Sequence, residues 1–82
     1  MHTMTNPDWL PLEALIGDEL APDFMYMGTE ETPVGTIHSY KHIDTRRYLH
    51  LDDEGNPYLY RQNHPDRYVR TSKTAAISYA FS

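Results

Sequence analysis

Several tyrosines, a histidine and a set of cations in the middle of the sequence have the chemistry of a binding surface. Exposed aromatic rings stack on nucleic-acid bases while nearby cations hold phosphates. Tyrosine and arginine also supply much of the binding energy at protein interfaces. In the structural alternative, tyrosines at alternate strand positions pack against a neighbouring strand. The candidate binding residues are Tyr40, Tyr48, His50, Tyr58 and Tyr60, and their basic flank is Lys41, Arg46, Arg47 and Arg61.

The five histidines do not form a recognisable metal-binding pattern. A zinc site needs ligands that converge to about 2 Å from the ion. His38 and His42 would be neighbours on a helix, but on a strand they would stand roughly 13 Å apart. The chain also has no cysteine. We therefore expect no metal site and no cofactor.

Two histidines have acidic neighbours that are suited to proton transfer, His50 with Asp52 and His64 with Asp66. The sequence lacks a nucleophile elbow, a phosphate-binding glycine-rich loop and a cysteine nucleophile. A domain of this size also offers little volume for a site that excludes water. We therefore expect no catalytic residues, and a small enzyme built on His50 or His64 is an alternative.

Charge is divided unevenly along the chain, whose formal net charge is −5. Residues 1–35 hold seven acidic and no basic residues, whereas residues 36–82 hold seven basic and five acidic ones, which gives −7 and +2. Such asymmetry is typical of a charged binding surface or of two parts of one domain that attract each other. The candidate acidic surface, suited to a basic partner, consists of Asp18, Glu19, Asp23, Glu30 and Glu31.

A β-hairpin over residues 47–61 is the clearest local signal. Two apolar and aromatic segments flank residues 52–56, where Gly55 supplies the positive φ that a three-residue hairpin loop requires. Pairing Asp52 with Asn56 places the leucines on one face of the hairpin and the tyrosines on the other. The predicted cross-strand pairs are Leu51 with Pro57, His50 with Tyr58, Leu49 with Leu59, and Tyr48 with Tyr60.

Residues 36–43 predict a strand that joins this hairpin through a turn at 44–46. A three-residue loop would place His38, Tyr40 and His42 on the tyrosine face, whereas a two-residue loop would shift the register. The sequence does not decide between them. Residues 28–35 are expected to form a loop, and residues 67–70 a short strand.

Short helices are predicted near both ends of the sequence. In the first helix, Asp8 is the expected N-cap, Trp9, Leu12 and Ile16 form an apolar stripe, and Gly17 ends the helix. Residues 72–82 fit either a helix capped by Ser72 or an alternating strand, and the cap favours the helix. Residues 1–7 are expected to be disordered.

The sequence therefore predicts one small α+β domain, residues 1–82, with an antiparallel meander of three to four strands and two short helices. The lack of cysteine, of a leader segment and of a long apolar run favours a cytoplasmic protein without a membrane association. We expect a non-enzymatic binding or regulatory protein that contacts a protein partner, as an inhibitor or accessory factor. A single-stranded RNA-binding module is the alternative. A thin core and open sheet edges also favour a homodimer.

Overall fold

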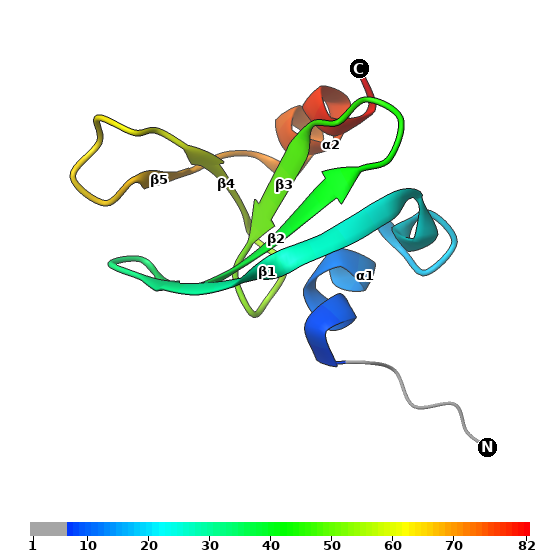
Figure 1. The fold of residues 1–82 in the computed structure, drawn as a ribbon, viewed down its shortest axis with the longest axis horizontal. Helices are drawn as coiled ribbons and strands as arrows, with labels where there is room; N and C mark the ends of the chain where they lie inside the picture. The colour runs from blue at the N-terminus through cyan, green and yellow to red at the C-terminus, as the bar shows by residue number, and fades with distance from the viewer. Residues whose placement is uncertain (1–6) are drawn as a thin grey trace.

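The computed structural model describes residues 7–82, which form an α+β fold with one five-stranded antiparallel sheet (Figure 1). Disorder was predicted for residues 1–7. Residues 1–6 lie outside the described residues, and Pro7 begins a 3-10 helix. In chain order the elements are η1 (Pro7–Trp9), α1 (Leu10–Ile16), η2 (Ala21–Asp23), β1 (Phe24–Thr32), β2 (Gly35–His42), β3 (Tyr48–Leu51), β4 (Pro57–Tyr60), β5 (Tyr68–Arg70) and α2 (Lys73–Phe81).

The sheet is a meander in the order β1-β2-β3-β4-β5, with one strand more than the sequence predicts. The predicted loop over residues 28–35 is wrong, because β1 continues to Thr32 and pairs with β2 on both sides of an irregularity at Met27. Polar side chains hold this end together. The Thr36 hydroxyl donates a hydrogen bond to the Glu31 carboxylate, and the Thr32 hydroxyl donates one to the Gly35 carbonyl at 2.7 Å. Such a strand lacks the apolar alternation by which strands are recognised in a sequence.

The 47–61 hairpin forms with the predicted register. His50 lies opposite Tyr58 and Leu51 opposite Pro57, and these two predicted pairs are confirmed. Gly55 has a φ of 84°, and its N–H donates to the Asp52 carbonyl at 3.0 Å. The pairing between β3 and β4 does not continue to the two outer predicted pairs, so the strands diverge toward their open end, as Figure 1 shows.

The connection between β2 and β3 decides where Tyr40 lies. The His42 N–H donates to the Arg47 carbonyl at 2.9 Å, so four residues, Ile43–Arg46, form the turn. The strands therefore pair in the register that a two-residue loop would give, and not in that of a three-residue loop. Tyr40 lies opposite Leu49 on the leucine face. The prediction that Tyr40 belongs to an exposed tyrosine face is wrong, because its side chain is fully buried. Burial raises the pKa of its phenol well above the usual value, and its hydroxyl donates to the Asp8 carbonyl at 2.5 Å.

Both helices pack on the leucine face of the sheet. The core consists of Leu12, Ala21, Phe24, Tyr40, Leu49, Leu51, Ala76 and Ala80. In α1, Leu12 is buried and Gly17 ends the helix as predicted, but Trp9 and not Asp8 occupies the N-cap. In α2, Ser72 caps the helix as predicted and accepts the Ala75 N–H at 3.0 Å. Neither helix of the described residues is long and apolar enough to span a membrane.

Candidate functional site

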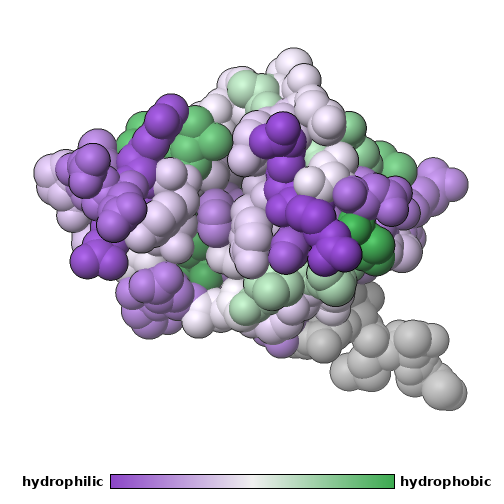
Figure 2. Space-filling view, turned by 45° about the horizontal axis from the view of Figure 1, so that its top comes forward, coloured by the Kyte–Doolittle hydropathy of each residue, from purple (hydrophilic) through white to green (hydrophobic). Residues whose placement is uncertain are grey.

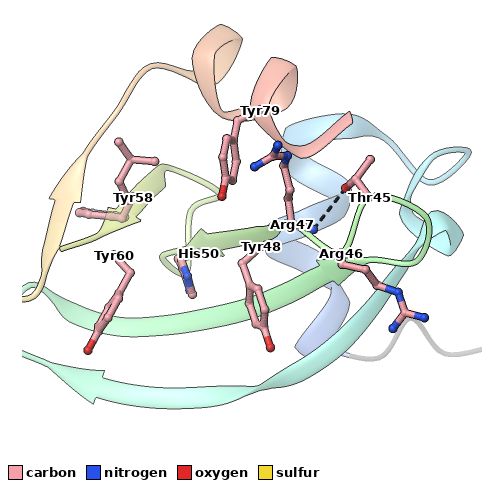
Figure 3. A pocket seen from close by; sticks show the side chains of 9 residues that line it. Thr45, Arg46, Arg47, Tyr48, His50, Tyr58, Tyr60 and Tyr79 are labelled. Carbon is pink, nitrogen blue, oxygen red and sulfur yellow. Dashed lines mark hydrogen bonds between the residues drawn. The ribbon is translucent and has the colours of Figure 1, made fainter. Parts of the chain in front are cut away.

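A hollow of about 550 Å³ opens where β3 and β4 diverge, and we call it the tyrosine hollow. Strands β3 and β4 form its walls, α2 contributes Tyr79, and the turn between β2 and β3 forms its rim (Figure 3). Because pairing stops at His50 and Tyr58, the strands leave a wedge-shaped gap between them. Its lining residues are Thr45, Arg46, Arg47, Tyr48, His50, Tyr58, Leu59, Tyr60 and Tyr79.

The aromatic rings of the tyrosine hollow form a row on the face away from the core. Tyr48 and His50 stack with ring centroids 5.6 Å apart and an interplanar angle of 15°, and the His50 ring lies 6.4 Å from that of Tyr60. Tyr48 is 37% and Tyr60 48% exposed. The rings remain accessible because both helices pack on the opposite face. Tyr48, His50 and Tyr60 extend side by side in Figure 3.

Three cations lie against tyrosine rings in and around the hollow. The Arg47 guanidinium lies 4.7 Å from the Tyr79 ring centroid. Figure 3 shows the Arg47 side chain directed toward Tyr79. Lys41 lies over Tyr48 and Arg70 over Tyr58, each at 5.8 Å. Cation–π contacts of this kind contribute roughly 0.5–1 kcal/mol each at exposed positions. They hold the cations beside the rings without neutralising their charge.

The hollow carries positive charge from Arg46 and Arg47, which form no ion pair with a carboxylate among the described residues. No aspartate or glutamate is among its lining residues. Within residues 7–82, no arginine or lysine forms an ion pair with a carboxylate, and the single ion pair joins His38 to Asp53. Figure 2 shows strongly hydrophilic side chains gathered in separate places on one side of the molecule, with less polar side chains between them. The hollow is thus suited to a ligand that is anionic and partly apolar.

His50 sits at the centre of the aromatic row. Its Nδ1 lies 2.8 Å from Ser39 Oγ, and its ring meets Tyr68 edge-on at 5.3 Å. Burial lowers the pKa of His50 below its usual value, and the nearby Glu30 carboxylate offsets part of this shift. Burial, followed by the charge of Glu30, raises the pKa of the Tyr68 phenol, whose hydroxyl donates to Glu30 at 3.3 Å. The neutral imidazole is therefore favoured, and the row ends at a carboxylate.

The structure brings together most of the predicted sheet-face residues. Tyr48, His50, Tyr58 and Tyr60 line one hollow together with Arg46 and Arg47. Lys41 lies at its margin through Tyr48, whereas Arg61 follows β4, exposed, and does not line it. The sequence reasoning missed Thr45, Leu59 and Tyr79. Tyr79 lies more than thirty residues from Arg47 in the sequence, so no local pattern predicts their contact.

The predicted acidic residues fall into two separate groups. Asp18, Glu19 and Asp23 are exposed around the segment between α1 and β1. Glu30 and Glu31 lie near the other end of β1. At about 3.3 Å per residue, the seven residues from Asp23 to Glu30 span roughly 20 Å. The two groups therefore do not form one continuous patch.

A second polar cluster, which sequence reasoning missed, surrounds His38. Its Nδ1 lies 2.9 Å from Thr29 Oγ1, and its Nε2 lies 2.6 Å from Asp53 Oδ1. These contacts tie β1, β2 and the β3–β4 turn together around a buried imidazole. No group of three or more metal-ligating side chains forms within the described part of the chain. The other histidine considered for catalysis, His64, is exposed in the loop before β5, where its Nδ1 accepts the Asp66 N–H at 3.1 Å.

The tyrosine hollow thus combines accessible aromatic rings, unpaired cations and a volume within the usual range of binding sites, roughly 300–1,000 Å³. The His38 cluster, by contrast, links three elements of the fold. No protein-family model, curated protein or solved structure matches this chain, so only its own geometry and chemistry bear on its function.

Proposed function

We propose that this protein is a non-enzymatic binding module that recognises another protein through the tyrosine hollow. The observation that carries this proposal is the row of rings at Tyr48, His50 and Tyr60 on the face away from the core, in which Tyr48 and Tyr60 are exposed. The contact would make the protein an inhibitor or an accessory factor of its partner. The lack of cysteine fits action in a reducing compartment such as the cytoplasm.

The physical reason lies in what these side chains gain on contact. Tyrosine buries a large area and loses little conformational freedom, since only two side-chain torsions are fixed. Tyr48 and Tyr60 are already held by neighbouring rings, Tyr48 by His50 and Tyr60 by Tyr68 at 5.4 Å. Binding would therefore order few additional groups. Preorganised aromatic and arginine side chains in a concave patch are typical of interface hot spots.

A single-stranded nucleic acid is the second candidate ligand, favoured by the stacked Tyr48 and His50 rings with Lys41 beside them. Bases stack on such rings with little sequence preference. The net charge of −5 opposes this candidate, because affinity for nucleic acid depends on neutralising phosphates along a basic path.

The deciding experiment compares two double variants as bait for partner capture from lysate of the source organism, with and without nuclease. Y48A/Y60A removes two rings of the hollow. L10A/L20A removes two other exposed apolar side chains, 51% and 43% exposed, that lie outside it. We expect a nuclease-resistant protein to bind wild type and L10A/L20A but not Y48A/Y60A, while all three keep the same circular dichroism spectrum.

Two results would contradict the proposal. Equal capture by Y48A/Y60A would place the contact elsewhere on the molecule. Loss of all captured material after nuclease treatment would favour the nucleic-acid candidate.

Self-association stays a separate proposal. The edge strand β1 has nine residues, and Met25 and Met27 on it are exposed. An open edge of this length can pair with the same strand of a second copy. Sedimentation equilibrium at high micromolar concentration should show a dimer, and a monomer there would refute it.

A further inference from the structure

The backbone that carries the two arginines of the tyrosine hollow is anchored by hydrogen bonds within the turn and to α2. Arg46 and Arg47 begin at the turn between β2 and β3, where the Arg46 N–H donates to the His42 carbonyl at 2.9 Å. Thr45 Oγ1 accepts the Arg47 N–H at 3.2 Å and donates to the Ala80 carbonyl of α2 at 2.6 Å. The two guanidinium groups therefore project from a backbone that is fixed to α2.

The charge of these two arginines is left without a counter-ion. Arg47 contacts the face of Tyr79, which contributes no negative charge, and both arginines are exposed. The described carboxylates form no ion pair with either arginine. Arginine presents a planar fork of donors that matches a carboxylate or a phosphate. Figure 3 shows Arg47 directed toward Tyr79 and Arg46 directed away from it, so each guanidinium offers its own position for an anion.

The surroundings of the hollow favour a short anionic segment over a continuous polyanion. Beyond His50 the aromatic row reaches Tyr68, whose hydroxyl contacts Glu30. A nucleic-acid strand laid along the row from Arg47 would carry its next phosphates toward this carboxylate. A peptide can place an acidic side chain at the arginines and an uncharged one near Glu30.

The rest of the hollow matches an apolar neighbour of that acidic side chain. Tyr48 on β3 and Tyr60 on β4 provide ring faces near the two arginines, and the half-buried Leu59 on β4 provides an aliphatic surface. The hollow thus offers cationic groups at its rim next to a row of rings. This arrangement is complementary to a peptide in which acidic and aromatic residues alternate.

We propose that the tyrosine hollow recognises an acidic segment of its protein partner, with carboxylates bound at Arg46 and Arg47 and an aromatic side chain packed against Tyr48 and Tyr60. This inference rests on the proposed function and names the chemistry of the partner. The same partner surface would be repelled by the acidic parts of this chain, so the hollow would also fix the orientation of the complex.

The test measures binding of three fluorescein-labelled probes by fluorescence anisotropy. The first is a decapeptide of alternating glutamate and phenylalanine, the second replaces each glutamate with glutamine, and the third is a ten-nucleotide oligouridylate. The variant is R46Q/R47Q. Its matched control, R61Q/R67Q, removes the same charge outside the hollow. Each variant also replaces one arginine whose φ is positive, 66° at Arg46 and 68° at Arg67.

We expect the glutamate peptide to bind wild type at least about tenfold more tightly than the glutamine peptide, because charged partners strengthen hydrogen bonds. R46Q/R47Q should weaken this binding by about tenfold or more, and R61Q/R67Q by much less. Added salt should weaken it moderately, since few charges are involved.

Several outcomes would overturn the inference. These are equal binding of the glutamine peptide, equal loss in both arginine variants, tighter binding of the oligouridylate, and no binding of the glutamate peptide at about 1 mM. The failure of the inference can be told apart from failure of the proposed function. If Y48A/Y60A abolishes partner capture while R46Q/R47Q captures the partner normally, the proposed protein-binding function is supported. Only the proposal that the partner presents an acidic segment is then refuted.

Discussion

Replacing Gly55 with alanine should destabilise the protein more than the same change at Gly17. Both glycines have a positive φ, 84° at Gly55 and 86° at Gly17, where ψ is 163°. Their surroundings differ. A Cβ at Gly55 would lie 3.0 Å from the Pro11 carbonyl oxygen and 3.2 Å from the Ala14 Cβ, whereas a Cβ at Gly17 would meet nothing within 4 Å. Both changes strain the backbone, but only the change at Gly55 also meets the close approach of α1 to the hairpin turn.

The expected magnitudes follow from these contacts. A backbone of positive φ costs an L-residue roughly 1–3 kcal/mol, and the conformation of Gly17 is one that glycine almost alone adopts. The reduced entropy of the unfolded chain returns about 0.4–1 kcal/mol. Gly17→Ala should thus lower the free energy of unfolding by about 1–2 kcal/mol. At Gly55, the clash with the backbone of α1 adds about 1–2 kcal/mol, as overpacking typically does. Gly55→Ala should therefore cost about 2–3 kcal/mol.

Urea unfolding followed by circular dichroism measures both values. A domain of this size is expected to have a stability of only about 3–5 kcal/mol. Gly55→Ala should therefore lower the urea midpoint by about half or more, with an unchanged slope. Equal losses in the two variants would refute the reasoning, because they would mean that α1 does not pack against the β3–β4 turn.

Three further predictions concern the turn, the central histidine and the second helix. Asp52→Ala should lower the free energy of unfolding by about 1–2 kcal/mol, because Asp52 Oδ1 accepts the backbone N–H groups of Glu54 and Asn56, both at 2.9 Å; the exposed Glu54→Ala is the control, and equal small losses by urea unfolding would contradict this. Burial lowers the pKa of His50 in the folded state, so as the pH falls the unfolded chain binds a proton at this residue before the folded protein does. The free energy of unfolding therefore keeps its full value above about pH 6.5 and decreases as the pH falls below it. His50→Gln should accordingly show a shallower fall in unfolding free energy between about pH 7 and 5, and parallel profiles would disprove the assignment. Ser72→Ala should cost about 1 kcal/mol by removing the α2 cap, and an unchanged melting temperature would argue against that cap.

Much of the fold followed from local chemistry. The hairpin register depended on Gly55 and on alternation of apolar residues, both of which operate within a few residues. The α2 helix followed from its Ser72 cap. Strand β1 was missed because its second half, residues 28–32, is polar and is stabilised by cross-strand hydrogen bonds that exist only once β2 lies beside it.

The candidate site was predictable only in part. Alternation placed Tyr48, His50, Tyr58 and Tyr60 on one face, and the structure brings these four together. Tyr40 was misplaced because one additional residue in the turn between β2 and β3 inverts which face each β2 side chain occupies. Turn length was not fixed by the residues 44–46 themselves, since the observed turn is held by His42 and by the Thr45 contact with Ala80.

The sequence by itself determined the elements that depend on neighbouring residues: the hairpin, its tyrosine and leucine faces, and the two helices with the Gly17 end of α1 and the Ser72 cap of α2. Only the tertiary structure decided that both helices cover the leucines, that β3 and β4 diverge, and that Tyr79 meets Arg47 in the hollow between them. The physical reason is the range of the interactions. Caps and turns are satisfied within a few residues, whereas the choice of buried face minimises the exposed apolar area of the whole chain and is made only when distant segments pack together.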